Sequence, residues 1–136
     1  MTSRYLETVD GLLRDSFPDT SGRWPRACAW LLRLALEGAL RDLWSREHPA
    51  VATVPMRAQL LSLRVLRGLD PAVPARADHL WACLSRAGHY HPYELSPTAP
   101  ELRAWYHDVQ ALVVAFSTEA GAAPAAEAAG PTAPSA

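Results

Sequence analysis

One segment of the sequence, from Ser85 to Leu95, concentrates side chains that can do chemistry: Arg86, His89, Tyr90, His91, Tyr93 and Glu94. An arginine fork can hold two phosphate oxygens and stabilise developing charge. A histidine can remove or deliver a proton near neutral pH. With Arg86 and His91 in these roles, the segment would cleave RNA without a metal, with the ribose 2′-hydroxyl as the nucleophile.

Two other interpretations of this segment stay open. In the first, His89 and His91 form a His-x-His pair that binds a metal with Glu94, or with His107 and Asp108, although the spacing specifies no third ligand. In the second, the segment is structural: its tyrosines pack, its histidines cap helix ends and its glutamate pairs with an arginine. We expect no metal and no cofactor.

A resemblance to a known family supports the first interpretation. Residues 86–91, Arg-Ala-Gly-His-Tyr-His, fit the Arg-x4-His pattern of the HEPN superfamily, and the motif falls between the last two expected helices, as it does there. The resemblance implies a helical bundle, often dimeric, whose active members are metal-independent endoribonucleases with the Arg and His of two subunits in a shared cleft. It makes Arg86 the phosphate-holding residue and His91 the acid/base. The substrate-binding residues that go with this assignment are His89, Tyr90 and Tyr93.

The leading prediction is therefore an RNA-binding protein or a metal-independent endoribonuclease, with a toxin–antitoxin or defence setting implied by the resemblance alone. The alternative is a non-catalytic module that dimerises or docks a protein partner. Residues 23–86 hold ten arginines against five acids, and this charge either attracts a phosphate backbone or decorates solvated helix faces. Trp30, Leu34 and Trp44 fall partly outside the main apolar stripe of their helix. Exposed together, they would indicate a partner surface, so we expect a homodimer.

The amino-acid composition indicates the source and the general class of the protein. All 13 basic residues are arginine, and lysine, asparagine and isoleucine are absent, which favours a bacterial source with a high-GC genome. No apolar run reaches the length of a membrane span, and the first residues are unlike a signal peptide, so a cytoplasmic protein is expected. Cys28 and Cys83 each fall in an apolar helical stretch, which is typical of buried free thiols.

The hydrophobic periodicity predicts an all-α fold, an antiparallel helical bundle of about five helices. The expected helices cover about residues 3–17, 25–46, 55–67, 75–87 and 99–118, and the last begins with a capping box at Thr98 and Glu101. The second, with the widest apolar face, should be central. On it Glu37 is either a buried carboxylate paired with an arginine, such as Arg33 or Arg41, or part of the polar side. Residues 1–118 form the predicted domain, and residues 119–136 a disordered Ala/Pro-rich tail.

Overall fold

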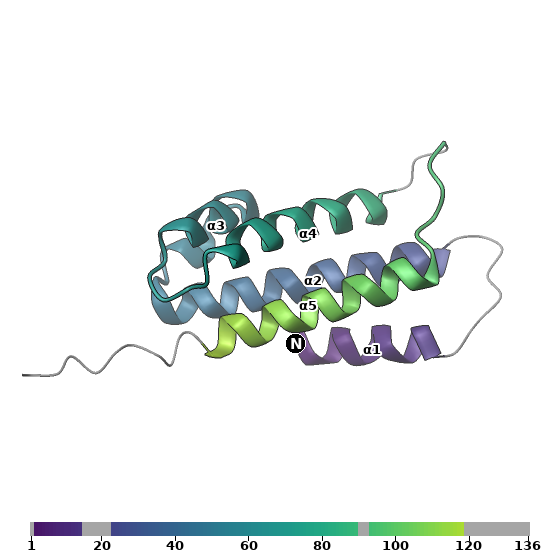
Figure 1. Ribbon diagram of the computed structural model, residues 1–136, viewed down its shortest axis with the longest axis horizontal. Helices are drawn as coiled ribbons and strands as arrows, with labels where there is room; N and C mark the ends of the chain where they lie inside the picture. Colours follow the sequence, from purple (N-terminus) through teal and green to yellow (C-terminus); the bar gives the residue numbers. More distant parts are fainter. Residues whose placement is uncertain (1, 15–22, 90–92, 119–136) are drawn as a thin grey trace, which may run out of the picture.

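The chain folds into a bundle of helices, as the periodicity predicts (Figure 1). The computed structural model describes residues 2–14, 23–89 and 93–118. Within them lie five α-helices, with no strand among the described residues: α1 (Thr2–Arg14), α2 (Arg23–Glu47), α3 (Met56–Ser62), α4 (Ala72–Gly88) and α5 (Ala99–Thr118). Two short 3-10 helices, η1 (Val51–Thr53) and η2 (Leu63–Val65), flank α3. The end of the first expected helix and the predicted tail lie outside the described residues.

Helix α2 is the central element, as its wide apolar face predicts. It packs against α1, α3, α4 and α5, and Figure 1 shows it enclosed between them, with successive long helices running in opposite directions. Nine of its apolar residues are buried: Cys28, Ala29, Leu32, Ala35, Leu36, Ala39, Leu40, Leu43 and Trp44. These residues are spread around much of the helix circumference. A helix with neighbours on several sides buries more than one narrow stripe of apolar side chains.

The expected exposed patch of Trp30, Leu34 and Trp44 does not form. Trp44 is only 2% exposed and belongs to the core, whereas Trp30 is 44% exposed and Leu34 is partly buried. The three residues fall partly outside the main apolar stripe of α2, but the helices on its several sides bury Trp44 as well. The condition for a partner surface, joint exposure of the three residues, is therefore not met, and this observation does not support a dimer.

The third expected helix is shorter than its apolar pattern suggests. α3 ends at Ser62, η2 follows to Val65, and Leu66 is extended with ψ 122°. Gly68 has φ +87°, a conformation that favours glycine, and it reverses the chain toward α4. Leu61, assigned to the apolar face of this helix, is instead 66% exposed. α3 therefore presents apolar surface to solvent.

The capping box at the start of α5 is confirmed. The Thr98 amide donates to Glu101 Oε2 at 2.8 Å, and the Glu101 amide donates to Thr98 Oγ1 at 3.3 Å. The hydrogen bonds that Glu101 Oε2 accepts from the Thr98 amide and from the Thr98 hydroxyl hold the pKa of Glu101 below its usual value. Among the described helices, none is both long and apolar enough to cross a membrane.

Candidate functional site

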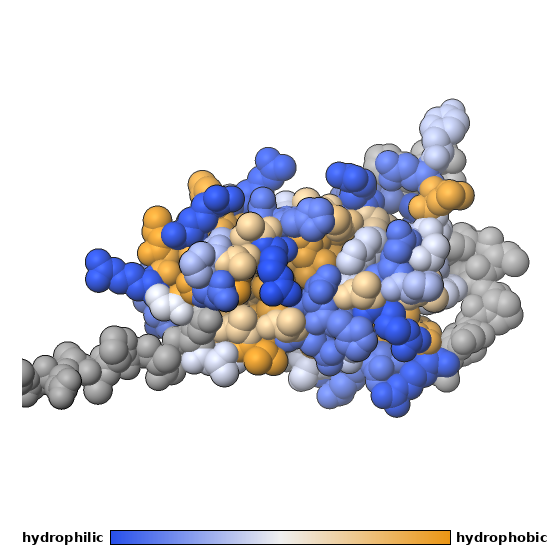
Figure 2. Space-filling view, viewed as in Figure 1, coloured by the Kyte–Doolittle hydropathy of each residue, from blue (hydrophilic) through white to orange (hydrophobic). Residues whose placement is uncertain are grey.

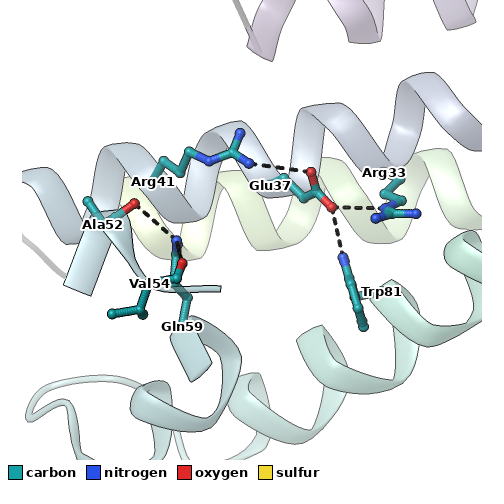
Figure 3. A network of polar contacts seen from close by, with 7 residues as sticks. All are labelled: Arg33, Glu37, Arg41, Ala52, Val54, Gln59 and Trp81. Carbon is teal, nitrogen blue, oxygen red and sulfur yellow. Dashed lines mark hydrogen bonds and ion pairs between the residues drawn. The ribbon is translucent and has the colours of Figure 1, made fainter. Parts of the chain in front are cut away.

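A buried carboxylate on α2 organises the polar interactions between α2 and α4 (Figure 3). Glu37 is 6% exposed, and its Oε1 accepts hydrogen bonds from Arg33 Nε at 2.8 Å and from Trp81 Nε1 at 3.1 Å. Arg41 Nη2 lies 3.7 Å from Oε2. Of the two interpretations of Glu37, the buried carboxylate paired with arginine is therefore right. The network fixes the Trp81 indole on α4 relative to α2.

The Arg33 guanidinium also contacts two aromatic rings. Its Cζ lies 5.1 Å from the ring centroid of Trp30 and 5.3 Å from that of Trp81, within the range of a cation–π interaction. Trp81 is thus held by a hydrogen bond at its nitrogen and by a cation near its ring. A side chain restrained in this way loses little conformational entropy when a ligand packs on it.

Gln59 fixes the start of α3 in a similar way. It is 1% exposed, and its Nε2 donates to the carbonyl oxygens of Ala52 and Val54 at 3.1 and 2.9 Å (Figure 3). These bonds tie η1 and the following turn to α3 and supply partners for two carbonyls. Because both acceptors are main-chain atoms, no pattern of side chains in the sequence signals this role.

Between α3 and α4 the surface opens into a groove of about 410 Å³. Its lining comes from both helices and from η2: Arg57, Leu60, Leu61, Arg64, Asp78, Trp81 and Ala82. Val65, which follows the lining residue Arg64 in the chain, is 82% exposed. Figure 2 shows hydrophobic side chains at the surface over the α3 end of the molecule, among hydrophilic ones. We call this feature the α3–α4 groove.

The charges at the α3–α4 groove are mostly positive. Arg57 and Arg64 both line it and are both exposed, whereas Asp78 is its one acidic residue. Across residues 2–14, 23–89 and 93–118, neither guanidinium has a hydrogen bond or an ion pair. The sequence analysis did not predict this groove. The signal that could have found it is the seven-residue spacing of Arg57 and Arg64, which places both on one face of the single helix that the sequence predicts through about residue 67.

The predicted catalytic arginine lies elsewhere, on the solvent side of α4. Gly88 packs against α2, where a Cβ would come within 3.5 Å of Trp30 Cε3. Arg86, two residues earlier, is rotated about 200° from it around the helix and is exposed. Its side chain therefore extends away from α2. His91 lies outside the described residues, so the proposed convergence of Arg86 and His91 stays a prediction.

The neighbouring candidates are held through their main chain. His89 is the C-cap residue that follows α4 and is exposed, and its carbonyl accepts a hydrogen bond from Arg26 Nη1 at 2.7 Å. Arg26 Nη2 reaches the Glu94 carbonyl at 3.5 Å. The Tyr93 side chain is 99% exposed, so it does not pack as the structural interpretation expects. Tyr90 lies outside the described residues.

The alternative metal site finds no support in the described part of the chain. No group of three or more His, Cys, Asp or Glu side chains there is arranged to hold a metal ion. His107 and Asp108, the ligands suggested on α5, are exposed neighbours on that helix. The His107 ring lies edge-on to Tyr106, with centroids 5.6 Å apart.

Fold and surface together define the protein as an all-α helical bundle with an apolar, positively charged groove. Comparison with known proteins adds no family to this description. No family model, no curated protein and no solved structure matches the chain.

Proposed function

We propose that this chain is a non-catalytic helical binding module, and that its α3–α4 groove binds a protein segment carrying both apolar and acidic side chains. The observation that carries the proposal is the open groove with an apolar floor between two arginines, Arg57 and Arg64, that have no partner in the described chain. Exposed apolar surface next to polar residues is typical of partner-binding sites. Free guanidiniums are suited to forked contacts with carboxylates.

The lining of the α3–α4 groove favours a protein segment over a nucleic acid. Leu60, Leu61 and Ala82 give it an apolar surface that a sugar-phosphate backbone does not use. Asp78 lies in the same groove, where it would repel a continuous row of phosphates. An amphipathic helix can instead place apolar residues on the floor and carboxylates at the two arginines, as in other helix-in-groove complexes.

The groove is also held in shape before any ligand binds. Trp81 forms part of its wall and is fixed by Glu37 and Arg33. Gln59 fixes the start of α3, from which the opposite wall is built. Preorganised walls reduce the entropy cost of binding, which favours the groove as the interaction surface.

The proposal is tested by fluorescence anisotropy with a labelled amphipathic peptide that has leucines on one face and glutamates on the other. We expect binding that weakens by about tenfold or more in the double variant Arg57→Glu/Arg64→Glu, since two favourable charge contacts become repulsive. The matched control is Arg4→Glu/Arg76→Glu, which changes the same charge at exposed positions outside the groove. It should bind as the wild type does.

Four results would overturn the proposal. The first is an equal loss of binding in both double variants, and the second is equal binding of a peptide with lysine in place of glutamate. The third is tighter binding of a labelled oligouridine at the same arginines, which would make the groove a nucleic-acid site. A dimer in sedimentation equilibrium that Arg57→Glu/Arg64→Glu dissociates would also contradict it, because the occupant would then be a second copy of this chain.

RNA binding or metal-independent RNA cleavage at the segment after α4 is the second candidate. It is favoured by the exposure of Arg86 in the last turn of α4 and by the two main-chain contacts of Arg26 that restrain the flanking residues. In this account Arg86 holds phosphate and His91 transfers the proton, with the second copy of a homodimer completing the cleft, as the HEPN resemblance implies.

This second candidate has its own test. Labelled RNA should be cleaved in EDTA by the wild type and not by Arg86→Ala or His91→Ala, with the helical circular dichroism unchanged in both variants. Arg57→Glu/Arg64→Glu is the matched control and should cleave normally. Failure of the wild type to cleave or bind RNA would remove this candidate and leave the groove proposal intact.

A further inference from the structure

A second cavity lies between α4 and α5, away from the α3–α4 groove. It measures about 130 Å³, and its polar lining is Arg76, His79 and Cys83 from α4 and Asp108 from α5, with Trp105 beside them. The cavity is large enough for a small molecule and brings a nucleophile, a base and a cation to one place. Neither the proposed binding function nor the Arg86 segment uses any of these residues.

The thiol and the imidazole in this cavity are paired. Cys83 Sγ lies 3.6 Å from His79 Nε2, one helical turn away. In the neutral tautomer with its proton on Nδ1, the imidazole can accept the thiol proton through Nε2. Arg76 lines the same cavity, and the thiolate that this proton transfer forms is the nucleophilic state of a cysteine. Asp108 faces the cavity as well and can balance the imidazolium that proton transfer creates.

The two cysteines differ sharply, contrary to the expectation that both are buried. Cys28 on α2 is fully buried, and burial raises its pKa to about 11, so it stays a protonated, inaccessible thiol at neutral pH. Cys83 is partly exposed at its cavity. Partial exposure beside histidine and arginine is the environment in which cysteines react.

We propose that Cys83 is an oxidation site for small hydroperoxides, with His79 as the base that forms the thiolate. His79 takes the thiol proton, and the Cys83 sulfur attacks one peroxide oxygen. The S–O bond forms as the O–O bond breaks, and the leaving hydroxide takes the proton from the imidazolium. The sulfur is oxidised by two electrons to a sulfenic acid, and hydrogen peroxide is reduced to water.

The experiment treats the full chain with hydrogen peroxide, traps sulfenic acid with dimedone and follows both cysteines by mass spectrometry. We expect Cys83 to react faster than N-acetylcysteine, a fully exposed reference thiol, and Cys28 to stay unmodified. His79→Gln removes the base at an exposed position and should slow Cys83 by about tenfold or more. In urea the wild-type Cys83 should slow to the rate of the reference thiol.

Two outcomes would overturn the proposal: a folded-state rate at or below that of N-acetylcysteine, or an unchanged rate in His79→Gln. The urea measurement compares the wild type with itself. It therefore tests whether the folded structure accelerates oxidation of Cys83 even if His79→Gln is destabilised. Since these residues lie outside the α3–α4 groove, neither outcome bears on peptide binding there.

Discussion

At the scale of single residues, Glu37 shows how one buried charge can organise a surface. Its carboxylate accepts hydrogen bonds from Arg33 and Trp81, and Arg41 lies close to its other oxygen. A buried carboxylate is costly to desolvate, and this cost is tolerable only when the group is paired and hydrogen-bonded. Glu37 therefore couples the position of Trp81 to α2 and, through Trp81, shapes the wall of the α3–α4 groove.

Glu37→Gln should lower the free energy of unfolding by about 1–3 kcal/mol, because Arg33 loses its anionic partner while the side chain keeps its size. Urea unfolding followed by far-ultraviolet circular dichroism measures the loss. In a double-mutant cycle with Trp81→Phe, which removes the indole donor, we expect a coupling on the order of 1 kcal/mol. Because glutamine keeps an acceptor oxygen, additive effects of the two substitutions would show that the charge of Glu37 adds little to its hydrogen bond with Trp81.

Part of this network is predictable from the sequence. The four-residue spacing of Arg33, Glu37 and Arg41 indicates an interacting row on one helix. Trp81 lies 44 residues beyond Glu37, and its role depends on how α4 packs on α2, which no local pattern encodes. The same limit explains Trp44, which is buried because α2 has neighbours on several sides.

At the scale of secondary-structure elements, local signals were the most reliable. The capping box predicts the start of α5 because its two residues bond to each other's amides, a contact confined to one turn. α3 is the exception. Its apolar residues indicate one helix through about residue 67, yet the α-helix ends at Ser62. Its Leu61 is exposed rather than buried, because it lines the groove that opens between α3 and α4.

Thr98→Ala should destabilise the protein by about 1 kcal/mol at neutral pH, because an N-cap hydroxyl is lost. The effect should depend on pH. The Thr98 amide and, after it, the Thr98 hydroxyl lower the pKa of Glu101 in the folded state, and Thr98→Ala removes only the hydroxyl. The hydroxyl's contribution to stability is complete above the carboxyl's ordinary pKa and is lost as the pH falls through the lowered value. Unfolding of wild type and variant from neutral to acidic pH should therefore show the stability gap narrowing in acid. A gap that is constant or widens would contradict the assignment.

At the scale of the whole molecule, α2 forms the centre of the bundle, and the helices packed around it form the surface. α2 contacts every other α-helix, so its buried face accounts for the bundle that the sequence predicts. The groove arises where α3, a short helix, meets α4 without covering it fully. Fold class follows from periodicity, whereas the groove follows from packing between elements. For this reason the sequence predicts a site in the residues after α4, where a local motif lies, and does not predict the groove at Arg57 and Arg64.

The most direct test of the account is an NMR titration of the uniformly ¹⁵N-labelled protein with the leucine–glutamate peptide, followed at the tryptophan indole resonances. Trp81→Phe assigns the Trp81 signal by its disappearance. We predict that the Trp81 Nε1–H resonance shifts and saturates with the anisotropy curve, while the Trp24 and Trp105 indoles, outside the groove lining, do not move. An unmoved Trp81 signal at saturating peptide would contradict the claim that the α3–α4 groove is the binding site.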